Sequence, residues 1–385
     1  MQIRSKKASW WVTTALLAAW SLALLLAACS DDDAAGSAPP DASTALFDAR
    51  RDPSADAFLA ARAVYQEDEG LDSRLVRRYD PHFTVPDGID CRDAGVPAQY
   101  PDYCVGPARL QPLVLTAFNA GIEGSEPALP VRVQAARIEA ALLWFLYASQ
   151  YKESLTCTDK AKDCDSSYAY YTGGAPRPDG ASVSSGSCAP LATDYSPGAD
   201  DMYAPCAAAD SGVYQPIEAT ISTLARVEAF ERIATGASVD AAQTGGLGLA
   251  RYVLEVDPYA HQRAWDGLLA VRCWRELDPA VPAADLDLRE RARSQYDNAV
   301  LDGLAAIVHD RIGRYLRTSG AERQYYAAFV RTLGPALLFA AGGRDAANGA
   351  ALAAEFDSFD PANPDAAQAV AASAQERITA LFVCP

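Results

Sequence analysis

Histidine is scarce in this 385-residue chain, and the common catalytic and nucleotide-binding motifs are absent from it. The three histidines are His82, His261 and His309, and no two cysteines stand at the C-x-x-C spacing of zinc sites. The sequence contains neither a G-x-x-x-x-G-K-S/T phosphate-binding loop nor a G-x-S-x-G nucleophile elbow. No motif around a histidine indicates general acid–base catalysis. We therefore expect a protein that is not an enzyme.

Basic residues are also few. The chain has 33 lysines and arginines against 50 aspartates and glutamates, so its net charge is −17 at pH 7. Removing residues 1–28, which hold three of the basic residues and none of the acidic ones, makes the net charge −20. A surface of this charge repels nucleic acid and anionic lipid headgroups, whereas cations, including metal ions, suit it. We expect no nucleic-acid partner, and the simplest role of the charge is solubility.

Long apolar runs are missing except at the N-terminus. Arg4, Lys6 and Lys7 precede an apolar run over residues 10–28, which is followed at once by Cys29. A positive start, an apolar middle and small residues before the cut are typical of a secretory signal. A cysteine directly after two alanines indicates a lipoprotein signal, because its thiol accepts the diacylglycerol. We predict cleavage before Cys29 and a lipid anchor on it. The alternative is a transmembrane helix, for which the run is nearly long enough.

Residues 29–45 follow as a predicted flexible tether. They contain the run Asp31-Asp32-Asp33 and then mainly alanine, glycine, serine and proline, which leaves nothing to bury. In Gram-negative sorting, an aspartate directly after the lipidated cysteine favours the inner membrane, and this chain has Ser30 there. We expect attachment to the outer membrane or the cell surface. Residues 46–385 are expected to form an α-helical domain, either as one unit or as two subdomains that meet near 236–250.

Eight cysteines remain besides Cys29, and an even number is expected of disulfides in an oxidising compartment. Proximity in the sequence favours the pairs Cys91–Cys104, Cys157–Cys164 and Cys188–Cys206, which leaves Cys273–Cys384. Disulfides of this kind would pin two long irregular segments, residues 80–130 and 155–214.

Apolar residues recur at helical spacing over most of the chain, and no strand alternation is evident. The strongest pattern covers residues 131–154, which are apolar nearly all round and are therefore expected at the centre of a bundle. Further helices are predicted over 55–67, 110–119, 216–235, 259–276, 285–317, 320–341, 345–356 and 365–381. The sequence thus predicts an all-α fold, a multi-helix bundle with long disulfide-pinned loops.

Four glutamates lie on helix faces that we expect to be buried: Glu139, Glu153, Glu228 and Glu231. Carboxylates that point into a bundle are costly unless an arginine or a metal ion neutralises them. Di-iron proteins build sites from such carboxylates, although their Glu-x-x-His element is absent here. We predict that at least two of the four, from different helices, meet and bind iron. The alternatives are pairing with arginines such as Arg137 or Arg226, and exposure of the second pair to water.

Two segments show a family resemblance. One is the helix RIEAALLWFLY at residues 137–147, which runs into Tyr151-Lys152-Glu153, and the other is KDCDSSYAYYTGG at residues 162–174. The chain there resembles the low-iron-inducible, iron-assimilating periplasmic proteins of green algae and their bacterial relatives. The resemblance implies a helical, exported protein linked to iron and carries over no catalytic residues. We expect a membrane-anchored lipoprotein that binds iron or serves iron assimilation. The alternative is a non-catalytic interaction protein of the cell envelope or surface.

Overall fold

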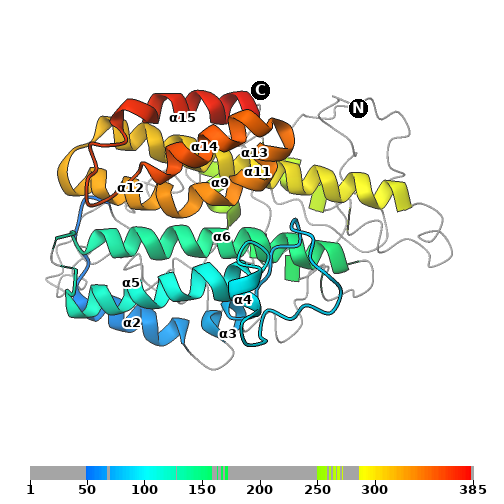
Figure 1. Ribbon diagram of the computed structural model, residues 1–385, viewed down its shortest axis with the longest axis horizontal. Coiled ribbons are helices and arrows are strands. Elements are labelled where there is room, and N and C mark those ends of the chain that lie inside the picture. The colour runs from blue at the N-terminus through cyan, green and yellow to red at the C-terminus, as the bar shows by residue number, and fades with distance from the viewer. Residues whose placement is uncertain are drawn as a thin grey trace, which may run out of the picture. The chain divides into compact units, whose positions relative to one another are not determined.

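The computed structural model of this protein describes part of the chain. The described residues are 49–66, 70–126, 128–157, 163, 166–167, 170–171, 249–257, 260–261, 263–265, 267–268, 271 and 286–382. All regular secondary structure in this part is helical (Figure 1), so the predicted all-α fold is confirmed. All the described residues belong to one compact unit, which lies within Ala42–Pro385. The predicted signal peptide, Cys29, the tether and the boundary near 236–250 lie outside the described residues.

Helix α6 (Arg132–Thr156) lies between two groups of helices. Every residue from 138 to 150 is buried, because apolar side chains cover nearly its whole circumference. Helix α5 (Gln111–Glu123) packs against it on one side and α12 (Gly320–Leu333) on the other (Figure 1). The central position predicted for residues 131–154 is therefore confirmed.

The first group consists of α5 and the helices that precede it in the chain, and it covers one side of α6. Its other members are α2 (Ala55–Tyr65), α3 (Leu71–Leu75), α4 (Val96–Gln99) and the π-helical turn η2 (Gly106–Leu110). Helix α2 begins after Ser54, whose hydroxyl accepts a hydrogen bond from the Ala57 N–H at 3.2 Å. Gly121 lets α5 approach α2 closely, because an added Cβ would lie 2.5 Å from the Phe58 ring.

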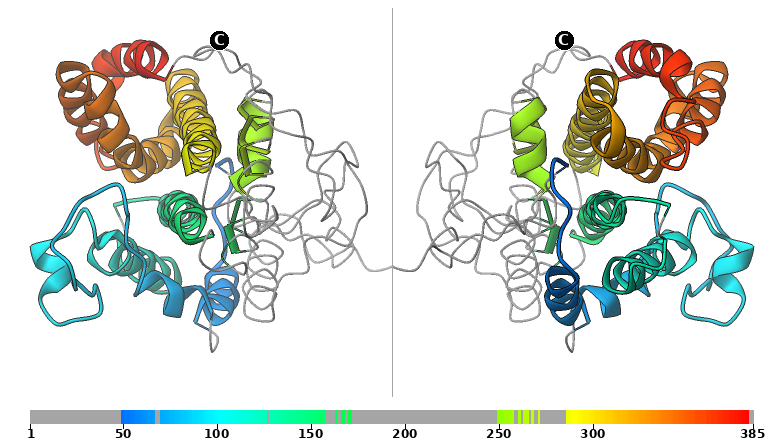
Figure 2. Two further views of the ribbon diagram at one scale, coloured as in Figure 1. Left: turned by 90° about the vertical axis from the view of Figure 1, so that its right-hand side faces the viewer. Right: turned by 90° about the vertical axis from the view of Figure 1, so that its left-hand side faces the viewer.

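The second group covers the other side of α6, and Figure 2 shows it end on. Besides α12, it comprises α9 (Leu249–Val256), α11 (Leu286–Arg317), η5 (Gly334–Leu337), α13 (Leu338–Arg344), α14 (Ala346–Asp357) and α15 (Gln368–Leu381). Helix α11 contacts α9, α12 and α15. Its contact with α9 is close at Gly303, where an added Cβ would lie 2.4 Å from Val253.

The prediction of one helix over 320–341 is wrong. Helix α12 ends at Leu333, and the 3₁₀ turn η5 intervenes before α13 begins at Leu338. Pro335 has no N–H with which to continue the helical hydrogen bonds. Gly334 allows the chain to pass the Phe356 ring, which would lie 2.7 Å from an added Cβ. The predicted helix over 216–235 lies outside the described residues.

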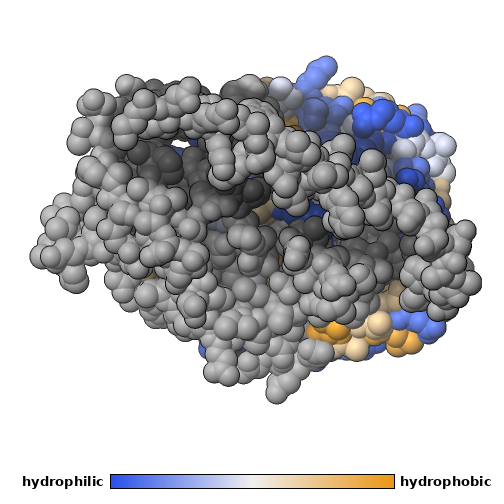
Figure 3. Space-filling model, turned by 180° about the vertical axis from the view of Figure 1, so that it is seen from behind, coloured by the Kyte–Doolittle hydropathy of each residue, from blue (hydrophilic) through white to orange (hydrophobic). Residues whose placement is uncertain are grey.

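The described surface mixes polar and apolar side chains. Its exposed large hydrophobic residues are Leu59, Val76, Leu254, Leu316 and Phe339. On the face in Figure 3, the part that is described is mainly hydrophilic, with a smaller hydrophobic area at the lower edge. In the described part of the chain, no helix combines the length and the apolar character needed to cross a bilayer.

Candidate functional site

Glu139 of α6 lies where α6, α9, α11 and α12 come together, and its hydrogen-bonding and charged partners come from the other three helices. It is buried, and its carboxyl group accepts hydrogen bonds from Tyr252 of α9 at 2.9 Å and from Tyr325 of α12. Burial raises the pKa of Glu139, while Arg311 of α11 and the two tyrosine hydroxyls act in the opposite direction. The inward carboxyl group is thus surrounded by two phenols and a guanidinium.

Glu153 forms a buried ion pair. Its carboxylate lies 3.3 Å from Arg78 and 3.1 Å from Lys152. Burial by itself would raise the pKa of Glu153, but the two cations outweigh burial and lower it. The alternative that an arginine neutralises the inward carboxylate holds for Glu153, with Arg78 as the partner. Arg137 instead bonds Glu126 at 3.0 Å, and Arg226 lies outside the described residues.

The four glutamates selected from the sequence do not form a site within the described residues. Glu139 and Glu153 stand fourteen residues apart on α6, which is roughly 21 Å along a helix axis. Glu228 and Glu231 lie outside the described residues. In the described part of the chain, no group of three or more histidine, cysteine, aspartate or glutamate side chains is arranged to hold a metal ion. The meeting of these glutamates therefore stays a prediction.

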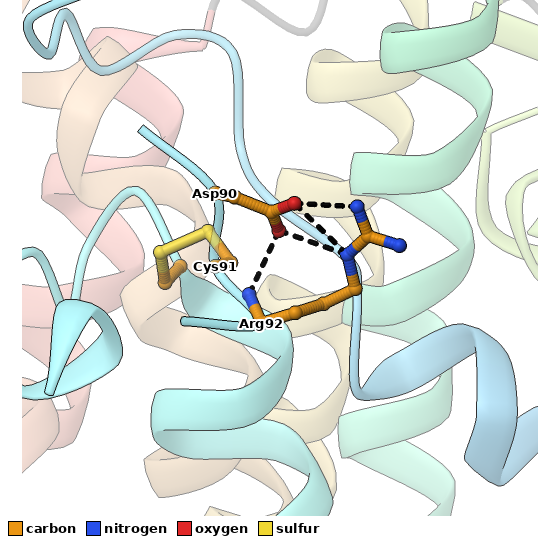
Figure 4. Close-up of a disulfide and its surroundings, with 4 residues drawn as sticks. Asp90, Cys91 and Arg92 are labelled. Carbon is orange, nitrogen blue, oxygen red and sulfur yellow. Dashed lines mark hydrogen bonds and ion pairs between the residues drawn. A yellow bond between two sulfur atoms is a disulfide. The ribbon is translucent and has the colours of Figure 1, made fainter. Parts of the chain in front are cut away.

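One predicted disulfide, Cys91–Cys104, is confirmed. Beside it, hydrogen bonds from Arg92 to the Asp90 carboxylate (Figure 4) lower the pKa of Asp90 to about 2. We call residues 78–106, which contain this bond, the disulfide loop. Cys157 is also disulfide-bonded. The other predicted bridge residues, Cys164, Cys188, Cys206, Cys273 and Cys384, lie outside the described residues.

A cluster of polar and aromatic side chains surrounds His82. We call it the His82 cluster, and it consists of Asp80 and His82 from the disulfide loop, Tyr147 and Tyr151 from α6, and Asp297 from α11. His82 Nδ1 lies 2.7 Å from Asp80 Oδ1, and His82 Nε2 lies 3.2 Å from Asp297 Oδ2. The Tyr147 hydroxyl is 3.3 Å from His82 Nε2 and 3.3 Å from Asp297 Oδ1. The Tyr151 ring stacks on the imidazole, with 3.9 Å between centroids.

Local backbone structure holds His82 in this position. The Asp80 N–H donates to the Tyr103 carbonyl at 2.7 Å, next to the disulfide-bonded Cys104. The Asp80 side chain accepts from the His82 N–H at 3.0 Å, and the Asp80 carbonyl accepts from the Phe83 N–H at 3.3 Å. An aspartate that bonds the backbone two residues ahead stabilises such a turn. The disulfide therefore supports the turn that presents the imidazole.

The charges of the cluster are coupled. Burial lowers the pKa of His82, but its hydrogen bonds with Asp297 and Asp80 outweigh burial and raise the pKa to about 9. At neutral pH the ring is therefore an imidazolium that donates from both nitrogens. Burial, with Asp297 and Asp80 nearby, raises the pKa of Tyr147 well above its ordinary value. Two carboxyl groups thus face one cationic ring and a protonated phenol.

Donor atoms from three side chains of this cluster have the spacing of metal ligands, and the two Asp297 oxygens each face a different partner. Bonds of about 2.0–2.1 Å to one metal place neighbouring ligand atoms roughly 2.9–3.4 Å apart. His82 Nε2, the Asp297 carboxylate and the Tyr147 hydroxyl are 3.2–3.3 Å apart. A carboxylate on the second ring nitrogen, as Asp80 provides, is the usual arrangement at a metal-binding histidine. Without a metal, the same contacts join the disulfide loop to α6 and α11.

Sequence reasoning missed this cluster. His82 is 65 residues from Tyr147 and 215 residues from Asp297. The local signals were the Asp80-x-His82 spacing and the separation of Tyr147 and Tyr151 by one helical turn, which places both on one face. Neither signal indicates Asp297, because its position depends on how α11 packs.

The second segment of the family resemblance, residues 162–174, is described only in part. Tyr170 is buried and accepts a hydrogen bond from Arg78 at 3.4 Å, and Tyr171 is fully buried, 3.2 Å from His261 Nδ1. These two tyrosines belong to the core. No protein-family model, no curated protein and no solved structure matches this chain.

Proposed function

We propose that this protein is a membrane-anchored extracytoplasmic lipoprotein that binds ferric iron through His82, Tyr147 and Asp297. The proposal rests on the convergence of these three donors, which come from three distant segments and lie 3.2–3.3 Å apart. The lipoprotein signal, the acidic composition and the resemblance to iron-assimilating proteins support it from the sequence.

The donor set suits a hard cation. Carboxylate oxygen suits such ions, imidazole suits iron, and phenolate oxygen is a known ligand of ferric iron. Asp80 keeps the proton on His82 Nδ1, so that Nε2 faces the metal. The bound cation takes the place of the proton on Nε2, and its charge favours the phenolate form of Tyr147 in spite of burial. The metal neutralises the negative charge of the two carboxyl groups in the cluster.

A ferric titration of the purified full chain in detergent tests the proposal. We expect saturable binding of one iron at this site and a visible charge-transfer band from a tyrosinate–iron bond. Tyr147→Phe should remove the band, and His82→Ala should weaken binding. Tyr65→Phe is the matched control, because it also removes a buried phenol hydroxyl, on α2.

The outcome that overturns the proposal is equally specific. It fails if the chain takes up no iron, or if the band and the affinity of Tyr147→Phe equal those of the unmodified chain. Circular dichroism of each variant establishes that a lost band does not come from a lost fold.

A further inference from the structure

The disulfide loop also contains a cleft, which is separate from the ligands proposed above. Its volume is about 370 Å³, within the range of roughly 300–1,000 Å³ that is usual for small-molecule sites. The residues of its lining that matter here are Tyr79, Pro81, Phe83, Pro86, Asp87 and Tyr103. Tyr79, Pro81 and Phe83 alternate along the chain with Asp80 and His82, so the cleft and the His82 cluster share one turn of backbone.

Three of the ten residues that line the cleft are aromatic. Tyr79 and Tyr103 stack on each other with 4.9 Å between centroids and an interplanar angle of 21°. Phe83, which also lines the cleft, is fixed by an edge contact with Phe339 at 5.0 Å. These contacts fix the rings, so little conformational entropy is lost when a ligand binds against them.

One charged side chain accompanies the rings. Among the residues that line the cleft, all of them described, Asp87 is the only acid, and there is no lysine, arginine or histidine. Asp87 is exposed and precedes Gly88, whose φ of +81° is a left-handed conformation that glycine adopts without strain. The turn thus holds a carboxylate at the rim of an aromatic cleft.

We infer that this cleft binds an organic ammonium ion, namely a quaternary or methylated amine. The faces of aromatic rings attract such cations, and aromatic sites for quaternary ammonium groups are the common functional use of that attraction. Asp87 adds an opposite charge. An anionic ligand would meet a carboxylate with no cation to offset it, and an uncharged apolar ligand would leave the carboxylate without a partner.

The site is held in shape before a ligand arrives. The Tyr103 carbonyl accepts the Asp80 N–H at 2.7 Å, and the Cys91–Cys104 bond follows directly after Tyr103. Gly106 N–H donates to the Arg78 carbonyl at 3.0 Å, which fixes the other end of the same two backbone segments. A preformed site avoids part of the entropic cost of binding.

Calorimetric titration with choline tests this inference on the full chain in detergent. We expect saturable binding, and at least about tenfold weaker binding of the uncharged isostere in which carbon replaces the quaternary nitrogen. Asp87→Asn should weaken choline binding severalfold, whereas Asp93→Asn, the same change at an exposed position of the same loop outside the cleft, should not. Tyr103→Leu should weaken it about tenfold, with Tyr100→Leu as its control.

Three results would overturn the inference: no saturable choline binding, equal affinity for the isostere, or equal effects of Asp87→Asn and Asp93→Asn. Asp87 is exposed, so Asp87→Asn gives a result even if Tyr103→Leu disturbs the loop. Tyr147→Phe should leave choline binding unchanged, which separates this test from that of the iron site.

Discussion

Among single residues, Glu139 has the plainest consequence for stability because it is a buried carboxyl group with a raised pKa. A raised folded-state pKa means that the folded protein holds its proton more tightly than the unfolded chain. Stability contributed by this group is therefore present below its ordinary pKa of 4.5 and is lost as pH rises towards the folded-state value. The hydrogen bond from Tyr325 limits that loss, because it favours the ionised form.

Tyr325→Phe should destabilise the protein by about 1–3 kcal/mol at neutral pH, because a buried acceptor loses its donor. The destabilisation should be smaller near pH ~4, where Glu139 is protonated in both states. Urea unfolding of the variant and the unmodified chain at the two pH values measures this. An equal loss at both would show that Tyr325 does not act through the charge of Glu139.

Two glycines within helices provide a matched pair of alanine substitutions, which again tests single residues. Gly121→Ala places a Cβ within 2.5 Å of the buried Phe58 ring and should cost about 1–3 kcal/mol through overpacking. Gly343→Ala in α13 meets no atom within 4 Å and should be neutral or slightly stabilising, because alanine favours helix. Thermal melts of both variants decide the matter, and the prediction is contradicted if their melting temperatures shift alike.

At the scale of elements, the two serines that precede α2 and α12 should contribute differently to the free energy of unfolding. Ser54 accepts a hydrogen bond from the first turn of α2, whereas Ser319 makes no side-chain cap on α12. Ser54→Ala should therefore cost about 0.5–2 kcal/mol, and Ser319→Ala should cost little. Chemical denaturation compares them, and a larger loss for Ser319→Ala would contradict the capping assignment.

Helices could be predicted from the sequence where periodicity dominates and not where tertiary contacts do. The apolar run in α6 has the pattern of a central helix, and it is one. The break after Leu333 depends on Gly334 meeting the Phe356 ring of α14, which no local pattern shows. Glu139 and Glu153 could be identified as inward-facing, but their partners Tyr325 and Arg78 come from distant segments. The His82 cluster was missed for the same reason.

For the whole molecule, the lipid anchor on Cys29 stays a prediction, which a single substitution tests. Cys29→Ser should abolish labelling with radioactive fatty acid and leave the signal peptide attached, because the thiol that accepts the lipid is gone. Labelling and mass spectrometry of the membrane fraction check this. Normal processing of the variant would contradict the lipoprotein assignment.

The iron site is most directly tested by anomalous scattering at the iron absorption edge from crystals of the full chain grown with ferric iron. We predict an anomalous peak bounded by His82 Nε2, the Tyr147 hydroxyl and the Asp297 carboxylate, within bonding distance of all three. A peak between glutamates of different helices, Glu139 or Glu153 with Glu228 or Glu231, would instead support the carboxylate cluster predicted from the sequence. Either that position, or no iron in the crystal, would contradict the proposed site.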